Sequence, residues 1–199
     1  LGATEMLPDR ATAFTIGFES PDVDETPAAR ETAARYDAIH RVRILPRGET
    51  LDLGDVLYMV EEPISTDALL PTGKVFEAVS REGITTVLTG EGSDEQLAGY
   101  RKFERACAWL HDGEPLPMTE GGPLDAYLSQ EEFIFPSPVE RSALIGEDVW
   151  DGRFRDIEEE AAELDPLSQM LLIEKRMRLP DRINQRLDRL SMAYSIEGR

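Results

Sequence analysis

The sequence is poor in cysteine, lysine and histidine. Cys107 is the single cysteine among 199 residues, so no disulfide can form within the chain, and this usage fits a reducing, cytoplasmic compartment. The segment Arg105-Ala-Cys-Ala-Trp109 is apolar and helix-favouring, which indicates a packed cysteine rather than a nucleophile. His40 and His111 are the only histidines, and we interpret both as surface or packing residues instead of a metal pair.

Long apolar runs and basic residues are also scarce. No apolar stretch reaches about 18 residues, and no basic-then-apolar leader opens the sequence, so neither membrane insertion nor secretion is predicted. Lysine occurs only at positions 74, 102 and 175, and the net charge is −19 at pH 7. Phosphate backbones require a basic surface, so nucleic acid is not an expected partner.

Acidic residues are abundant and evenly spread, with 40 Asp and Glu against 21 Lys and Arg. We expect a halophilic protein from a high-salt cytoplasm, where screening makes such charge tolerable. The alternative is an ordinarily acidic protein of a mesophile. The hydrophobic fraction, 41%, is typical of a globular chain that is long enough for one good core.

Strands and helices are predicted to alternate through the first hundred residues. β-Branched and apolar residues concentrate in Ala11–Phe18 and His40–Leu45, and an Ala-rich helix that starts at a proline, Pro27–Tyr36, separates them. Further helices are expected over 51–60 and 70–82, before a short buried strand at 85–88. This alternation predicts an α/β fold with a parallel sheet flanked by helices. The remainder is predicted to be mostly helical, over 102–110, 124–133, 142–150, 157–164 and 166–179.

A glycine-rich acidic segment, Thr89–Tyr100, follows the strand at 85–88. Gly90 and Gly92 flank a carboxylate, and Ser93-Asp94-Glu95 can open a helix. A strand that runs into such a turn favours anion binding, and its carboxylates call for a mediating cation such as Mg²⁺. The alternative is an acidic helix cap after a core strand. Ile16-Gly17 also lies at the carboxyl end of a predicted strand, where ligands of parallel sheets collect; Gly17 would let a ligand approach or would mark a bulge.

Three segments resemble the asparagine synthetase family in the family's order. Leu88–Tyr100 is similar to the family's L-S-G-E-G-S-D-E-x-F-G-G-Y, with Leu97-Ala98 in place of F-G. Leu179-Pro180 and Leu187–Arg199 resemble L-P and D-R-x-S-M-A-x-S-x-E-x-R. Phe14–Phe18, followed by an Asp-Glu pair at 24–25, resembles F-S-I-G-F…D-E more weakly. The resemblance covers nearly the whole chain and implies an adenine-nucleotide alpha-hydrolase-like fold.

The resemblance also implies chemistry. Family members convert aspartate to asparagine through a β-aspartyl-AMP intermediate, using ATP and ammonia from glutamine. Ile16, Gly17, Thr89 and Gly90 would then bind ATP, Glu91 would act in catalysis, and Asp94 would hold Mg²⁺. The carboxy-terminal motif would brace the floor of the site, although a buried network of ion pairs and hydroxyls is the favoured interpretation of Asp188, Arg189, Ser191, Ser195 and Glu197.

Several family features are not found in the 199 residues. The phosphate loop S-G-G-L-D-S, the glutaminase domain and the motif P-F-L-D are not present, so we expect a partial synthetase domain that is inactive alone. Its expected parts are a nucleotide-binding α/β part, 1–100, and a mostly helical part, 101–199. Two alternatives stay open: a related amidotransferase or cyclase that adenylates another carboxylate, and a non-catalytic remnant that serves as an interaction module. A homodimer is also left open.

Overall fold

A computed structural model describes residues 10–49, 52–62, 66, 68–103, 156–157 and 159–199. The chain divides into two compact units. Unit 1 is formed by the residues up to Thr89 together with Gln185–Arg199, and unit 2 by Gly90–Asn184. In the described helices, no segment is long and apolar enough to cross a membrane.

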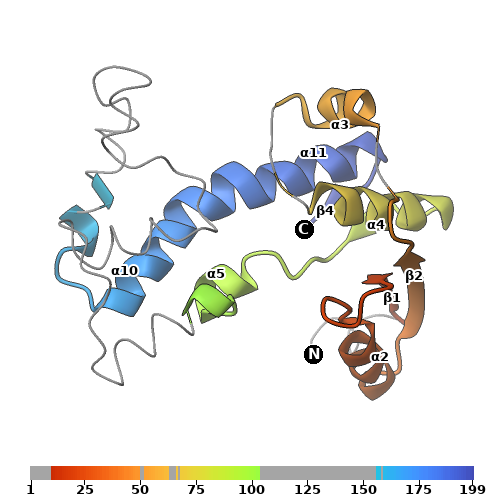
Figure 1. Ribbon diagram of the computed structural model, residues 1–199, viewed down its shortest axis with the longest axis horizontal. Helices are drawn as coiled ribbons and strands as arrows, with labels where there is room; N and C mark the ends of the chain where they lie inside the picture. The colour runs from red at the N-terminus through yellow and green to blue at the C-terminus, as the bar shows by residue number, and fades with distance from the viewer. Residues whose placement is uncertain (1–9, 50–51, 63–65, 67, 104–155, 158) are drawn as a thin grey trace. The chain divides into compact units, whose positions relative to one another are not determined.

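The amino-terminal part of unit 1 is a β–α–β element. Strands β1 (Thr12–Phe18) and β2 (Ile39–Leu45) pair in parallel, with Thr12 opposite Ile39 and Phe18 opposite Leu45. Helix α2 (Thr26–Arg35), with a proline in its first turn, connects them and lies against the strands in Figure 1. The predicted β–α–β segment is therefore confirmed.

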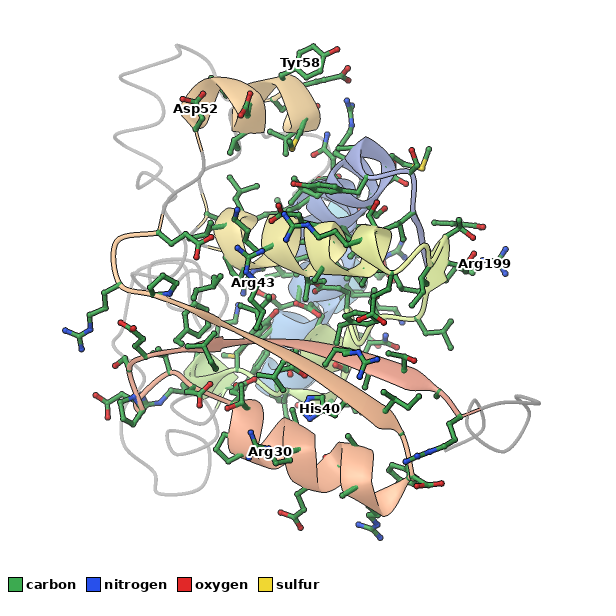
Figure 2. The ribbon with its side chains drawn as sticks, turned by 90° about the vertical axis from the view of Figure 1, so that its right-hand side faces the viewer. Arg30, His40, Arg43, Asp52, Tyr58 and Arg199 are labelled. Carbon is green, nitrogen blue, oxygen red and sulfur yellow. The ribbon has the colours of Figure 1, made fainter. Side chains whose placement is uncertain are left out.

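Helix α4 (Leu69–Arg81) is joined to the strands by an ionic cluster. The guanidinium of Arg43 donates to Glu77 on α4 over 2.9 Å and to Glu49 over 3.0 Å. The ammonium of Lys74 lies 3.3 Å from both carboxylates. Burial opposes ionisation of Glu77, but hydrogen bonds from Arg43 and Lys74 outweigh it and lower the pKa of this carboxyl. Figure 2 shows Arg43 on the α4 side of the strands and His40 on the α2 side.

A second, separate ladder lies at the end of unit 1. Strands β3 (Thr86–Val87) and β4 (Glu197–Gly198) pair in parallel, and the ladder continues to Thr89, whose N–H donates to the main-chain oxygen of Arg199 over 2.7 Å. The predicted α/β class with parallel strands is confirmed, but the described residues form two two-stranded sheets rather than one continuous sheet. The two-residue strand β4 was missed because so short a segment shows no alternation.

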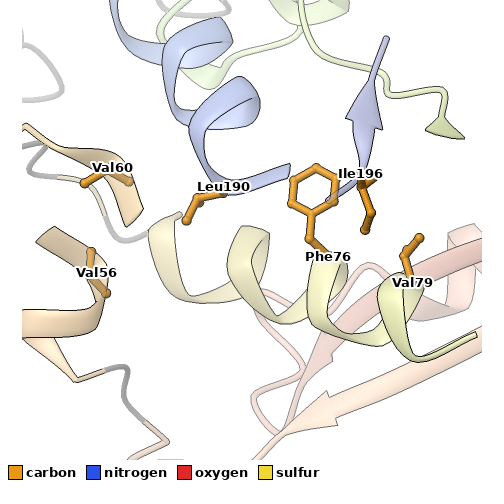
Figure 3. Close-up of a cluster of buried hydrophobic side chains, with 6 residues drawn as sticks. All are labelled: Val56, Val60, Phe76, Val79, Leu190 and Ile196. Carbon is orange, nitrogen blue, oxygen red and sulfur yellow. The ribbon is translucent and has the colours of Figure 1, made fainter. Parts of the chain in front are cut away.

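The core of unit 1 is built from three helices and the turn before β4. Val56 and Val60 come from α3 (Leu53–Val60), Phe76 and Val79 from α4, and Leu190 from α11 (Gln185–Ala193). Ile196 completes this buried cluster, which Figure 3 shows. Segments far apart in sequence thus share one apolar core, which brings the carboxy-terminal motif against the predicted nucleotide-binding half.

Unit 2 contains α5 (Ser93–Leu97), α10 (Pro166–Ile173) and a wide helix, η1 (Glu174–Asn184). Its core cluster is Phe103, Ile157, Met170 and Ile173. The sequence predicts a helix end at Leu179, but η1 continues through Pro180 and α11 follows directly. A π-type helix has more residues per turn than an α-helix. We attribute the continuation through Pro180 to this wider turn, which has room for a residue that lacks an N–H. The helices expected at 124–133 and 142–150, and the one at 102–110 beyond Phe103, lie outside the described residues.

Candidate nucleotide-binding site

Thr89 ends the β3–β4 ladder and is the last residue of unit 1 before the acidic turn. Both its N–H and its hydroxyl donate to the main-chain oxygen of Arg199, over 2.7 and 3.3 Å. The N–H is therefore occupied by the ladder. The groups that Thr89 could offer to a ligand are its carbonyl and the lone pairs of its hydroxyl oxygen.

The acidic loop, Gly90–Asp94, opens unit 2 as a tight turn. Ser93 closes the turn, because its N–H and its hydroxyl donate to the carbonyl of Gly90 over 3.2 and 2.6 Å. Gly92 has a φ of +89°, and a Cβ there would lie 3.4 Å from the methyl groups of Leu179. At Gly90, by contrast, a Cβ would meet no atom of the described residues within 4 Å. The backbone of Gly90 is therefore open to a close approach by a ligand.

The carboxylates of this segment differ in exposure. Glu91 and Asp94 are exposed, whereas Glu95 is 1% exposed and accepts a hydrogen bond from the hydroxyl of Tyr100. The Asp94 side chain lies over Gly99, since its Cγ is 2.9 Å from the place of a Cβ at residue 99. The absence of a side chain at Gly99 therefore determines where the Asp94 carboxylate can lie.

Asp94 fits one ligand of a magnesium site. Mg²⁺ in nucleotide sites is commonly held by one or two carboxylates together with substrate phosphates. Over the described ranges, no group of three or more His, Cys, Asp or Glu side chains is arranged to hold a metal ion. The other ligands of a magnesium ion at Asp94 would therefore come from outside the described residues. Phosphate oxygens of a bound nucleotide would be such ligands.

Gly17 lies at the end of β1, where its own chain fills the space beside it. A Cβ there would lie 2.6 Å from Ile44 and 2.7 Å from the carboxylate of Asp24. Asp24 accepts from the N–H groups of Phe18 and Thr26 over 3.2 and 3.3 Å and from the Thr26 hydroxyl over 2.6 Å. The lack of a side chain at Gly17 thus allows the turn that follows β1 to pack closely against the strand.

Ile16 borders a hollow of about 190 Å³ in unit 1. The hollow lies over β1, β2 and α4 and is mostly apolar, with charged groups at Arg41, Arg43 and Glu82. Arg41 donates to Glu82 over 2.9 Å, so that part of the charge is already paired. The apolar lining is formed by Phe14, Ile16, Val42, Val75 and Ala78.

The carboxy-terminal motif is less buried than predicted. Arg189 pairs with Glu61 across 128 residues, but Glu61 is 69% exposed. Asp188, Ser195 and Glu197 are also exposed. Ser191 alone is buried among the motif residues that the sequence singled out, and its hydroxyl donates to the carbonyl of Asp188 over 3.1 Å. The interpretation as a buried ion-pair network was therefore wrong; the polar groups lie on the surface around a buried serine.

Unit 2 contains a buried ionic network that sequence reasoning missed. Lys102 and Glu174 are each 0% exposed, and the ammonium donates to the carboxylate over 2.6 Å. Arg178 donates to the same carboxylate over 3.3 Å and lies 4.5 Å from the ring centroid of Tyr100. Burial, and then the hydrogen bond to Glu95, raise the pKa of Tyr100 well above its ordinary value. Seventy-two residues separate Lys102 from Glu174, so no local pattern marks the pair.

Comparison with known proteins gives one family. The profile of the asparagine synthase family matches residues 2–199. An asparagine synthetase [glutamine-hydrolyzing] of Saccharomyces cerevisiae is 34% identical over 97 residues, which are 47% of this chain and 17% of the yeast protein. The counterpart in Bacillus subtilis is 28% identical over 102 residues, 51% of this chain and 16% of that protein.

A protein named as an amidase is equally similar. Amidase chry2 of Gibberella zeae is 33% identical over 102 residues, 50% of this chain and 15% of the amidase. The aligned part is thus about one sixth of the length of these curated relatives. Because the family profile extends over almost every residue, including the acidic loop and the carboxy-terminal motif, the chain belongs to the asparagine synthase family.

Proposed function

We propose that this chain is part of a synthetase that forms asparagine from aspartate, ATP and ammonia released from glutamine. The observation that carries the proposal is the geometry of the acidic loop in a chain of this family. Gly90 is open to a close approach, and the exposed carboxylates of Glu91 and Asp94 follow it directly. An open backbone beside two solvent-facing carboxylates suits a magnesium–phosphate group better than it suits a structural helix cap.

The first step would activate the carboxylate of aspartate. One of its oxygens attacks the α-phosphorus of ATP; the new O–P bond forms as the bond to the β-phosphate oxygen breaks, and pyrophosphate leaves. Bound Mg²⁺ would neutralise phosphate charge in this step. The chain would contribute the backbone of Gly90 beside the phosphates and the carboxylate of Asp94 as a metal ligand. Ile16 and Thr89 are the residues of unit 1 that we assign to the nucleotide; Gly17 is not among them, because the turn at Asp24 fills the space beside it.

The second step would form the amide. The nitrogen of ammonia attacks the acyl carbon of the β-aspartyl-AMP, the C–N bond forms, and AMP leaves with the electron pair of the broken C–O bond. The nitrogen must lose a proton as the amide forms. Glu91 is the exposed carboxylate placed between the two loop glycines, and we assign it to accept that proton or to order the adenylate.

A related amidotransferase or cyclase is the second candidate. The observation in its favour is that two fungal proteins named amidases, chry2 and chyE, are 33% and 34% identical to this chain, as similar as the yeast synthetase at 34%. The same adenylation would then act on a carboxylate other than that of aspartate. The acidic loop alone does not select between these substrates, because it addresses the phosphates.

The test uses the complete gene product with ATP, Mg²⁺ and either glutamine or ammonium. Aspartate-dependent pyrophosphate release, with asparagine identified by mass spectrometry, is the expected result. Pyrophosphate release with another carboxylate, and none with aspartate, would select the amidotransferase. Absence of release with every carboxylate would support the non-catalytic remnant. Cytoplasmic location, a homodimer and the lack of nucleic-acid binding remain predictions from composition and resemblance.

A further inference from the structure

The buried network of unit 2 begins at an ion pair that is sealed from water. Lys102 and Glu174 have no exposed side-chain surface, and 2.6 Å separates the ammonium nitrogen from a carboxylate oxygen. The other carboxylate oxygen accepts from Arg178 over 3.3 Å. Both oxygens of Glu174 are therefore used, one by each cation, and the carboxylate can occupy only one orientation.

The network extends from this pair to the acidic loop. The ring of Tyr100 lies 4.8 Å from the ammonium of Lys102 and 4.5 Å from the guanidinium carbon of Arg178, within cation–π range of both. The hydroxyl of the same ring donates to Glu95. Glu95 lies in α5, next to Asp94, and is 1% exposed. A chain of direct contacts thus joins Glu174 on η1 to the residue beside the predicted metal ligand.

A second contact joins the same two elements. Leu179 follows Arg178 on η1, and its methyl groups lie 3.4 Å from the place of a Cβ at Gly92. The acidic loop is therefore held on η1 from two points, by apolar contact at Gly92 and by the polar chain through Tyr100. Both points lie on η1, the helix that begins with the buried Glu174.

Stability alone gives a poor reason for this arrangement. Removing two charges from water costs free energy that their attraction often fails to recover, and well-packed apolar residues of similar size are frequently as stable. What a buried hydrogen-bonded network adds is a restricted orientation for the groups that it joins. The arrangement therefore suits a segment whose side chains must be placed accurately.

We propose that Tyr100, Lys102, Glu174 and Arg178 are positioning residues that hold the acidic loop, and with it Asp94, in the geometry required for a magnesium–phosphate group. This role rests on the function proposed above. Loss of the network would leave aspartate binding unchanged, because none of these side chains is proposed to contact aspartate. It would weaken the response to Mg²⁺ and lower kcat, because the displaced carboxylate is the one that faces the metal.

The test is Tyr100→Phe in the complete gene product, which removes the hydroxyl that bonds Glu95 and keeps the ring beside both cations. The Mg²⁺ concentration for half-maximal pyrophosphate release should rise ~10-fold, as for lost outer-shell partners of a metal site, at unchanged KM for aspartate. Glu174→Gln, at the far end of the network, should act in the same direction. An unchanged Mg²⁺ requirement in both variants would overturn the inference.

Ile157→Val is the matched control, because it removes one buried methyl group from the apolar core against which Tyr100 packs and leaves every polar group of the network in place. It should reduce stability without shifting the Mg²⁺ requirement; an equal shift in this control would mean a merely structural role.

Amide hydrogen exchange of residues 91–94 provides a readout independent of turnover. Faster exchange in Tyr100→Phe but not in Ile157→Val would support the positioning role, whether or not the wild-type protein is active. If the wild-type protein were inactive, the proposed function would fail and the positioning role would still stand. Equal exchange in all variants would overturn the positioning role.

Discussion

The carboxylate of Asp94 lies directly over the α-carbon of Gly99, in the space that any larger residue would fill. The chain returns to this point after one short helix, α5, and the N–H of Gly99 donates to the carbonyl of Asp94 over 3.1 Å. Gly99 therefore matters through its contact with the predicted metal ligand, because the lack of a side chain at this position decides where the carboxylate can lie.

Gly99→Ala should displace the Asp94 carboxylate. The added methyl group would overlap Asp94 Cγ, so the side chain must rotate away while the fold is retained. We expect the Mg²⁺ requirement for pyrophosphate release to rise about tenfold, as for a disturbed metal surround. Gly90→Ala is the matched control: its methyl group enters open space, so it should raise KM for ATP and leave the Mg²⁺ requirement alone. The same Mg²⁺ shift in both variants would contradict this account.

Ala98→Gly should stabilise unit 2. Ala98 ends α5 with φ 58° and ψ 42°, a left-handed conformation that costs an alanine free energy and a glycine little. The gain should be small, about 0.5 kcal/mol, because glycine also loses more entropy on folding. Ala78→Gly, inside α4, should instead destabilise by about 1 kcal/mol. Urea unfolding midpoints that move in the same direction for both variants would refute the strain at Ala98.

Local sequence patterns predicted the local structure well. The β-branched residues around Thr12–Phe18 and the proline at the start of α2 identify a strand and a helix without help from distant residues. The glycines around Glu91 likewise predicted a turn that leads into a helix, which the structure confirms at Gly92 and α5. These features depend on backbone preferences of neighbouring residues, which a sequence displays directly.

Features set by distant residues were not predictable. The pairing of Thr89 with Arg199 belongs to a separate ladder, and it depends on two segments 110 residues apart. Lys102 looks like an ordinary surface lysine until Glu174 is placed beside it in a site that solvent does not reach. Gly17 suggested access for a ligand, but the turn at Asp24 fills that space. Each case is decided by tertiary contacts that the local pattern does not display.

Asp24 should make stability depend on pH in the acid range. The hydrogen bond from the Thr26 hydroxyl, followed by those from the N–H groups of Phe18 and Thr26, lowers the pKa of this carboxyl from its ordinary 3.8. A lowered folded-state pKa means that the contribution to stability is complete above the unfolded value and is lost as pH falls through the folded one. Asp24→Asn should therefore flatten the fall of the urea midpoint below about pH 4. Asp22→Asn, on the same turn, removes a charge without these hydrogen bonds and should keep the wild-type profile.

The net charge of −19 should make the folded protein more stable in salt. Screening shortens the range of carboxylate repulsion from about 10 Å at 0.1 M salt to about 3 Å at 1 M. We expect Tm to rise between these KCl concentrations. A variant with Glu31, Glu62, Glu159 and Glu163 changed to glutamine, all exposed in the structure, should show a smaller rise. A flat or falling Tm would remove the interpretation as a high-salt adaptation.

Glu91→Gln should lower kcat more than it affects ATP binding. Glu91 is exposed between Gly90, whose backbone is open, and Gly92, whose positive φ turns the chain into α5. An additional carboxylate beside phosphates is unfavourable in the ground state, so its benefit must arise as the reaction proceeds. Glutamine keeps the shape and removes the charge, and loss of an acid–base role should cost on the order of 10²-fold or more in kcat. Asp94→Asn should instead raise the Mg²⁺ requirement. If Glu91→Gln turned over normally, or lost ATP binding outright, Glu91 would be a structural part of the turn and the proton would need another acceptor.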